Sequence, residues 1–229
     1  MSEQEPVVSG ESTGTNQMTR RRFVILGGVF GAAIAAGGGG YLAANWGPDE
    51  TEELPRVKMG DSMNKVLVVY GTKSGCTSGV AERIGAALAG TGMSVDVLPA
   101  EDKPDPAGYD GVVVGSGIRV GQWHSAAKDW VRANAEILQN RPTAFYTVCL
   151  TIATDPEKTD EVRAYTDPIL AESGIEPVDI GLFGGWFEPK HFGLIERTVL
   201  KAMKAPQGDH RDWDAIDAWT AGVAPKLKV

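Results

Sequence analysis

The sequence has only two cysteines, Cys76 and Cys149, too few for disulfide bonds to stabilise a chain of 229 residues. Basic residues are also few: 22 Lys and Arg stand against 30 Asp and Glu, giving a formal net charge of −8. A protein that binds nucleic acid needs a basic surface, so this balance argues against such a partner. Hydrophobic residues are not scarce, at 42%, which excludes disorder throughout the chain.

Charge and proline are absent from residues 23–44, a stretch rich in glycine and alanine. As a helix rising ~1.5 Å per residue, it would reach roughly 33 Å, about the thickness of a bilayer core. Arg20, Arg21 and Arg22 precede this stretch, and acidic residues follow it between positions 49 and 53. Because the cationic side of such a segment stays inside, we expect attachment to the plasma membrane with the remainder of the chain on the outer side.

The run Thr19-Arg20-Arg21-Arg22-Phe23-Val24 resembles the twin-arginine export signal, in which two arginines precede a mildly apolar core. This resemblance implies export of a domain that is already folded, often with its cofactor inserted. The alternative is a plain signal anchor, in which the arginines serve only the charge rule. No Ala-x-Ala site stands out at the end of the apolar run, so the sequence leaves cleavage open.

The chain divides by composition into four parts. We expect a disordered leader over residues 1–18, a signal or transmembrane segment over 19–44, an acidic linker over 45–62 and a folded domain over 63–229. Within that domain, apolar runs typical of buried strands occupy residues 65–70, 94–98, 111–114, 143–150 and 178–183. Helical spacing of apolar residues occupies 78–89, 126–138, 161–171, 192–203 and 213–221. This alternation predicts an α/β fold with a doubly wound parallel sheet.

The loop after the first predicted strand is rich in hydroxyl groups, with the sequence Gly71-Thr-Lys-Ser-Gly-Cys-Thr77. Backbone N–H groups at the start of the following helix would make it an anion site. It is neither a Walker loop nor the Gly-x-Gly-x-x-Gly dinucleotide motif. Its Thr-x-Ser-Gly-x-Thr arrangement resembles the phosphate loop of flavodoxins, which implies FMN; the alternative is a Ser/Thr-rich turn that only caps a helix.

The segment Gly115-Ser-Gly-Ile-Arg-Val-Gly-Gln-Trp-His-Ser125 is expected to form a second loop, after the third strand. The pattern of its glycines with Arg119 and His124 resembles the corresponding motif of the flavodoxin-type, quinone-dependent protoporphyrinogen oxidases. Ala144-Phe145-Tyr146 and Asp212-Trp213 resemble that family too, and the similarity covers about residues 64–220. It implies five parallel strands in the order 2-1-3-4-5 and one FMN at their carboxyl ends. The FMN-binding residues implied are Thr72, Lys73, Ser74, Gly75, Cys76, Thr77, Gly115, Ser116, Gly117, Ile118, Thr147, Val148 and Cys149.

Two residues of the second segment are candidate catalytic residues. Arg119 can hold a substrate carboxylate or favour the reduced flavin by placing charge near its N1, and the alternative is a surface salt bridge. His124 can deliver a proton during hydride transfer, and the alternative is a solvated histidine at a helix start. Cys76 and Cys149 are either a redox pair or two unrelated thiols. His191 and His210, with two nearby aspartates, lack the spacing of metal ligands, so no metal is expected.

The sequence departs from the family in two respects. It carries the N-terminal export segment, whereas the family's members typically lack a leader. The segment Gly184–Phe192 is aromatic but less basic than the family's substrate-facing insertion. Three functions follow: a quinone-coupled dehydrogenase that oxidises a small organic reductant, a flavodoxin-type carrier that exchanges electrons with a protein partner, and a flavin-free scaffold. The aromatic segment favours the dehydrogenase.

Overall fold

The computed structural model describes residues 54–119, 121–189, 197–198, 201 and 207–228. By its internal contacts the chain splits into two units, residues 1–46 and 47–229, and the described residues all belong to the second. The leader and the signal or transmembrane segment expected over 1–44 therefore lie outside the described residues. Within the described part of the chain, no helix has the length and apolar character needed to cross a membrane.

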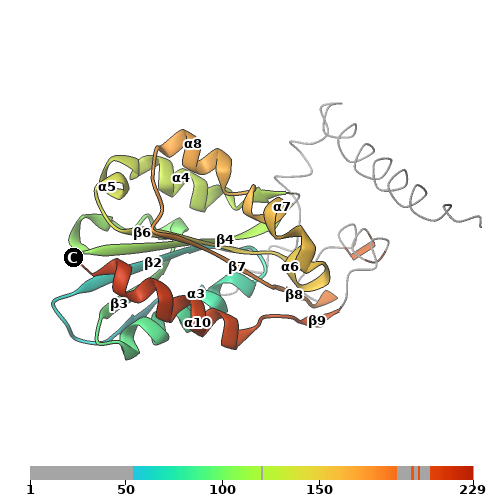
Figure 1. Cartoon of the computed structure of the whole chain (residues 1–229), viewed down its shortest axis with the longest axis horizontal. Helices are drawn as coiled ribbons and strands as arrows, with labels where there is room; N and C mark the ends of the chain where they lie inside the picture. The colour runs from blue at the N-terminus through green and yellow to red at the C-terminus, as the bar shows by residue number, and fades with distance from the viewer. Residues whose placement is uncertain (1–53, 120, 190–196, 199–200, 202–206, 229) are drawn as a thin grey trace, which may run out of the picture. The chain divides into compact units, whose positions relative to one another are not determined.

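The domain is built on a sheet of seven strands (Figure 1). Five of them pair in parallel, in the spatial order β3-β2-β4-β6-β7. Their bounds are β2 Lys65–Gly71, β3 Ser94–Pro99, β4 Gly111–Arg119, β6 Thr143–Val148 and β7 Asp179–Phe183. The other two pair antiparallel: β1 Val57–Met59 with β3, and β5 Gln122–Trp123 with β4. A separate ribbon joins β8 Trp186–Phe187 to β9 Gly208–Asp209.

Helices cover both faces of the sheet (Figure 1). One face packs against α3 Cys76–Gly90 and α10 Trp213–Val223. The other packs against α4 Ser125–Ala133, α5 Ala135–Gln139 and α8 Asp167–Ser173. Two short helices, α6 Leu150–Thr154 and α7 Thr159–Arg163, follow β6. The described single-turn 3₁₀ helices are η2 Ala100–Asp102, η3 Pro106–Gly108, η4 Pro156–Lys158 and η6 Ala224–Leu227.

The central strand β2 shows why the sheet is buried on both faces. Val66, Val68 and Tyr70 belong to the core beneath α3 and α10, whereas Leu67 and Val69 belong to the core beneath α4. All five are fully buried, so successive side chains of one strand supply two hydrophobic layers. The expected α/β fold with a parallel sheet is confirmed, and it brings the carboxyl ends of the parallel strands to one edge.

Three boundaries differ from the sequence-based expectation. Residues 57–59, expected within the acidic linker, form β1, an edge strand whose three residues are too few to show a periodic pattern. The helix expected over 126–138 is divided at Asn134, where the side-chain Nδ2 donates to the carbonyl of Trp130 at 2.8 Å and competes with the helical pattern.

The helix expected over 161–171 is divided into α7 and α8, with Pro168 in the first turn of α8, where a missing backbone N–H costs nothing. The helix expected over 192–203 lies mostly outside the described residues. The expected five strands become seven because β1 and β5 add short antiparallel pairings to the edge of β3 and the end of β4.

Candidate functional site

The hydroxyl-rich loop joins the buried strand β2 directly to the start of α3. Gly75 is the N-cap residue and has φ of 75°, a left-handed conformation that glycine adopts without strain. Within the described part of the chain, no side-chain capping hydrogen bond forms at this helix start, so the backbone N–H groups of its first turn are available to an anion. The side chains of Thr72 and Thr77 are 6% and 1% exposed, whereas Lys73 lies on the surface.

The segment expected to be a second loop is instead mostly strand. Residues 115–119 extend β4, and Ile118 and Arg119 then pair with Trp123 and Gln122 of β5 across a turn at Gly121. The prediction of a loop over the whole segment is wrong because Gly115 and Gly117 serve close packing within β4, and only Gly121 serves a turn. The Tyr146 ring, for example, occupies the space where a Cβ on Gly115 would lie.

The hairpin of β4 and β5 contacts the hydroxyl-rich loop at Gly117. A Cβ built on Gly117 would lie 2.8 Å from the Oγ1 atom of Thr77, closer than such atoms pack. The glycine therefore lets strand β4 approach the Thr77 hydroxyl. Ser116 faces the opposite side of the sheet, where its Oγ accepts from the backbone N–H of His124 at 2.7 Å and donates to the carbonyl of Gly117 at 2.9 Å.

The end of β6 contributes less to this edge than the sequence indicates. The Thr147 hydroxyl is fully buried and lies 3.3 Å from the hydroxyl of Thr166, inside the core. Val148 packs on the face beneath α3, near Gly185, and the backbone N–H of Cys149 donates to Phe183 at 2.9 Å.

Cys76 and Cys149 are buried free thiols. The Sγ atom of Cys76 accepts a hydrogen bond from the backbone N–H of Trp186 at 3.2 Å. Burial raises the pKa of Cys76 to about 11, so this thiol is protonated at neutral pH. The two cysteines are thus not bonded to each other, and Cys76 anchors the β8–β9 ribbon to the first turn of α3.

Arg119 and His124 lie at the same edge of the sheet. His124 is the N-cap residue of α4, and its side chain packs against Gly71 at the end of β2. Burial lowers the pKa of His124, and the nearby positive charges of Arg119, Lys73 and Lys128 lower it further. The structure therefore places a neutral imidazole near three cations. The imidazole packs against Gly71, the residue that precedes Thr72.

A pocket of about 290 Å³ opens beside the hydroxyl-rich loop. Its lining residues are Leu54, Pro55, Gly75, Ser78, Gly79, Glu82, Trp186 and Arg211. The Arg211 guanidinium lies 4.5 Å from the ring centre of Trp186 and 4.4 Å from that of Trp213, and it forms an ion pair with Asp209 at 2.5 Å. A Cβ on Gly79 would lie 2.5 Å from its Nη1 atom, so Arg211 reaches the second turn of α3.

Comparison with known proteins agrees with this arrangement. Residues 67–214 match the flavodoxin domain family. The chain belongs to this family. The quinone-dependent protoporphyrinogen IX dehydrogenase of Escherichia coli is 30% identical over 172 residues, which cover 70% of this chain and 94% of the relative. The corresponding protein of Leishmania major is 26% identical over 178 residues, which cover 72% of this chain and 77% of the relative.

Among solved structures, flavodoxin 2 of Bacillus cereus in its oxidised form is 21% identical, with a TM-score of 0.48. That match covers 71% of this flavodoxin-type chain and 99% of the Bacillus protein. The resemblance to quinone-dependent protoporphyrinogen oxidases that the sequence motifs carry is confirmed. The curated relatives are oxidoreductases, and the chain is an oxidoreductase of this flavodoxin type.

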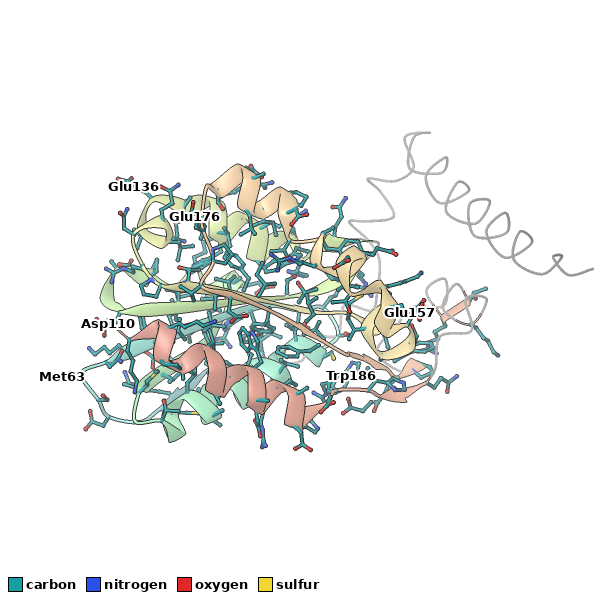
Figure 2. All side chains as sticks on the ribbon, in the orientation of Figure 1. Met63, Asp110, Glu136, Glu157, Glu176 and Trp186 are labelled. Carbon is teal, nitrogen blue, oxygen red and sulfur yellow. The ribbon has the colours of Figure 1, made fainter. Side chains whose placement is uncertain are left out.

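The structure brings Thr72, Thr77, Gly75 and Gly117 together and places Arg119 and His124 beside them, whereas the hydroxyl of Thr147 lies in the core. Figure 2 draws the described side chains in the orientation of Figure 1. Trp186 lies at one end of the flavodoxin-type domain, and Met63 and Asp110 lie at the other end.

Sequence reasoning missed Arg211 and Glu101. Arg211 reaches the site from the C-terminal part of the chain, and Glu101 Oε1 lies 3.6 Å from His124 Nδ1. Of the two aspartates near His210, Asp209 pairs with Arg211 and Asp212 caps the start of α10.

Proposed function

We propose that the chain is a membrane-attached FMN flavoprotein that oxidises a small organic reductant and passes the electrons to a quinone. The observation that carries this proposal is the contact of Thr77 with Gly117, which joins the anion-binding start of α3 to the β4–β5 hairpin. FMN would need both places at once, the start of α3 for its phosphate and the β4–β5 hairpin for its ring. The quinone-dependent relatives support the same acceptor for this chain.

The residues present fit FMN. The first-turn N–H groups of α3 and the hydroxyls of Thr72, Ser74 and Thr77 would hold the phosphate without a magnesium ion. Gly117 leaves room beside Thr77 that a side chain would fill. The further residues that would line the cofactor are Lys73, Gly75, Cys76, Gly115, Ser116, Ile118, Thr147, Val148 and Cys149. Ser116 and Thr147 would contribute backbone atoms only, because their hydroxyls pair elsewhere. When bound, FMN supplies a hydride acceptor, and the protein supplies orientation and charge.

Charge at the edge favours an anionic reductant. Arg119, Lys73 and Lys128 each place positive charge near His124. In this proposal Arg119 orients an anionic group of the reductant or stabilises negative charge on the reduced flavin. Neutral His124 takes up the proton that leaves the reductant, because its lowered pKa keeps it a base at neutral pH.

Attachment to the plasma membrane, with the domain on the outer side, is part of the proposal. It is supported by the uncharged residues 23–44, by Arg20, Arg21 and Arg22 before them and by the acidic residues after them. The resemblance of residues 19–24 to a twin-arginine signal supports export of the folded domain with its flavin in place.

The experiment is stopped-flow reduction of the FMN-loaded chain by protoporphyrinogen, followed by reoxidation with menaquinone. Arg119→Ala should slow flavin reduction by roughly 10²–10³-fold, the effect of losing a positive contact worth about 2–4 kcal/mol at the transition state. Its FMN affinity should change little, since the phosphate is bound elsewhere. Arg163→Ala, at an exposed position of α7, is the matched control.

A flavin that ignores both reagents but exchanges electrons readily with a protein partner would establish the electron-carrier function instead. A chain that binds no FMN at all would leave only a flavin-free scaffold. These two outcomes separate the three functions, because only the dehydrogenase needs both an organic reductant and a quinone.

A further inference from the structure

Residue His124 is held by contacts of both its backbone and its side chain. Its backbone N–H donates to the buried Ser116 Oγ at 2.7 Å, which fixes the start of α4 against β4. A Cβ on Gly71 would lie 2.9 Å from the Cβ of His124 and 3.2 Å from its Nδ1, so the ring packs directly on the end of β2. The side chain is 25% exposed, and its Nδ1 atom is buried without a hydrogen-bond partner in the described part of the chain.

The group that faces this nitrogen is a carboxylate. Glu101 lies in η2, and its Oε1 atom is 3.6 Å from His124 Nδ1. The Glu101 side chain is 38% exposed, and desolvation raises its pKa, as does the charge of Asp102, while Arg56 lowers it. The same imidazole is also near three cations that disfavour its charged form: Lys73 of the loop, Arg119 of β4 and Lys128 of α4.

We propose that Glu101 is a positioning residue that holds His124 as the tautomer with its proton on Nδ1, leaving Nε2 as the proton acceptor in the oxidation. This inference rests on the proposed function. With FMN bound, the flavin would accept a hydride, with its two electrons, from the organic reductant, and Nε2 of His124 would accept the accompanying proton. The imidazolium then releases that proton to water.

The chemistry of imidazole supports this assignment. A neutral ring donates from one nitrogen and accepts at the other, and a carboxylate cannot donate, so the nitrogen facing Glu101 is the one that carries the proton. A separation of 3.6 Å is longer than a hydrogen bond, as is common for such pairs before a substrate binds. When Nε2 gains a proton, the charged ring strengthens its attraction to Glu101, and a bond of about 2.7–2.9 Å becomes favourable.

The first experiment observes the tautomer directly, by nitrogen NMR of the full chain labelled at its three histidines. Wild-type His124 should show a protonated Nδ1 and an unprotonated Nε2. In Glu101→Gln, tautomers should mix and the His124 pKa should fall by about one unit, the low end of the effect of an opposite charge within ~4–6 Å. Glu136→Gln, at an exposed position of α5, should change neither signal.

The second experiment is a double-variant cycle on flavin reduction by the organic reductant. His124→Ala should slow reduction by at least roughly 10²-fold, the lower range of general acid–base catalysis, and Glu101→Gln should slow it less. If Glu101 acts through His124, the double variant should be no slower than His124→Ala alone. Additive losses, a proton on Nε2 in the wild type, or an unchanged His124 pKa in Glu101→Gln would each overturn the proposal. Failure of the reductant to reduce even the FMN-loaded wild type would instead overturn the proposed function, because the NMR result needs no reductant.

Discussion

The Oγ1 atom of Thr77 lies 2.8 Å from the position that a Cβ would take on Gly117. Thr77 belongs to the first turn of α3 and Gly117 to the end of β4, so this contact joins two segments that the sequence separates. It makes the two halves of the candidate flavin site a single structural unit. A change on either side of the contact should therefore affect binding of the same ligand.

Gly117→Ala should weaken FMN binding by roughly 10–10²-fold. The added methyl group would displace the Thr77 hydroxyl, and a lost hydrogen bond to a charged phosphate is worth about 1.5–3 kcal/mol. Fluorescence quenching of added FMN measures the affinity. Gly222→Ala is the matched control, because a Cβ there meets open space within α10 and should stabilise the helix by about 0.5–1 kcal/mol. Equal FMN affinity in both variants would argue against this contact.

Thr77→Leu should abolish FMN binding. The Thr77 side chain is 1% exposed at the start of α3, so a larger apolar side chain would fill the space expected for the phosphate and remove a hydroxyl donor. Thr77→Ser keeps the hydroxyl and should bind FMN nearly as well as the wild type. The absorbance spectrum of each purified chain reports the bound flavin, and far-UV circular dichroism shows that the fold is intact. A yellow Thr77→Leu protein would disprove this placement.

The thiol of Cys76 should be unreactive in the folded protein. With a pKa of about 11, only about a thousandth of it is thiolate at pH 8, and burial blocks access as well. Maleimide labelling followed by mass spectrometry should modify Cys76 far more slowly in the native than in the denatured chain. Comparable labelling rates in the two states would contradict the buried, protonated thiol.

The same raised pKa predicts how Cys76 affects stability at high pH. The thiol's contribution is fully present below the unfolded pKa of about 9 and is lost as pH rises toward about 11, because the unfolded state ionises first. Urea unfolding of Cys76→Ser, which has no thiol to ionise, should therefore lose less stability than the wild type between those two pH values. Parallel pH profiles of the two proteins would count against this prediction.

Replacement of Arg20 and Arg21 by lysine should stop export if the twin-arginine route is used. Lysine keeps the positive charge that a general membrane anchor requires, so only a pathway that reads the two arginines should fail. Cell fractionation and protease access to the folded domain measure the outcome. Unchanged export of the double variant would leave the plain-anchor mechanism, and a wild-type chain found only in the cytosol would exclude both.

The sequence alone determined the fold class and the position of the hydroxyl-rich loop. Buried strands such as residues 65–71 carry continuous apolar runs, and amphipathic helices carry a period of 3.6 residues, so both patterns are local and readable without contacts. The position of the hydroxyl-rich loop could also be predicted, because its place between a strand and a helix follows from those same patterns. The extent of a strand that contains glycines could not, as residues 115–119 of β4 show.

Only the tertiary structure decided which distant residues meet at the site. Glu101 opposite His124, Arg211 against Gly79 and Trp186 on Cys76 depend on how the helices and the β8–β9 ribbon pack at the sheet edge. No local periodicity records such pairings, since they form only when the intervening chain folds back and the apolar layers become buried. The residue types at this edge are known from the sequence, whereas their proximity depends on tertiary packing. That proximity and burial lower the pKa of His124.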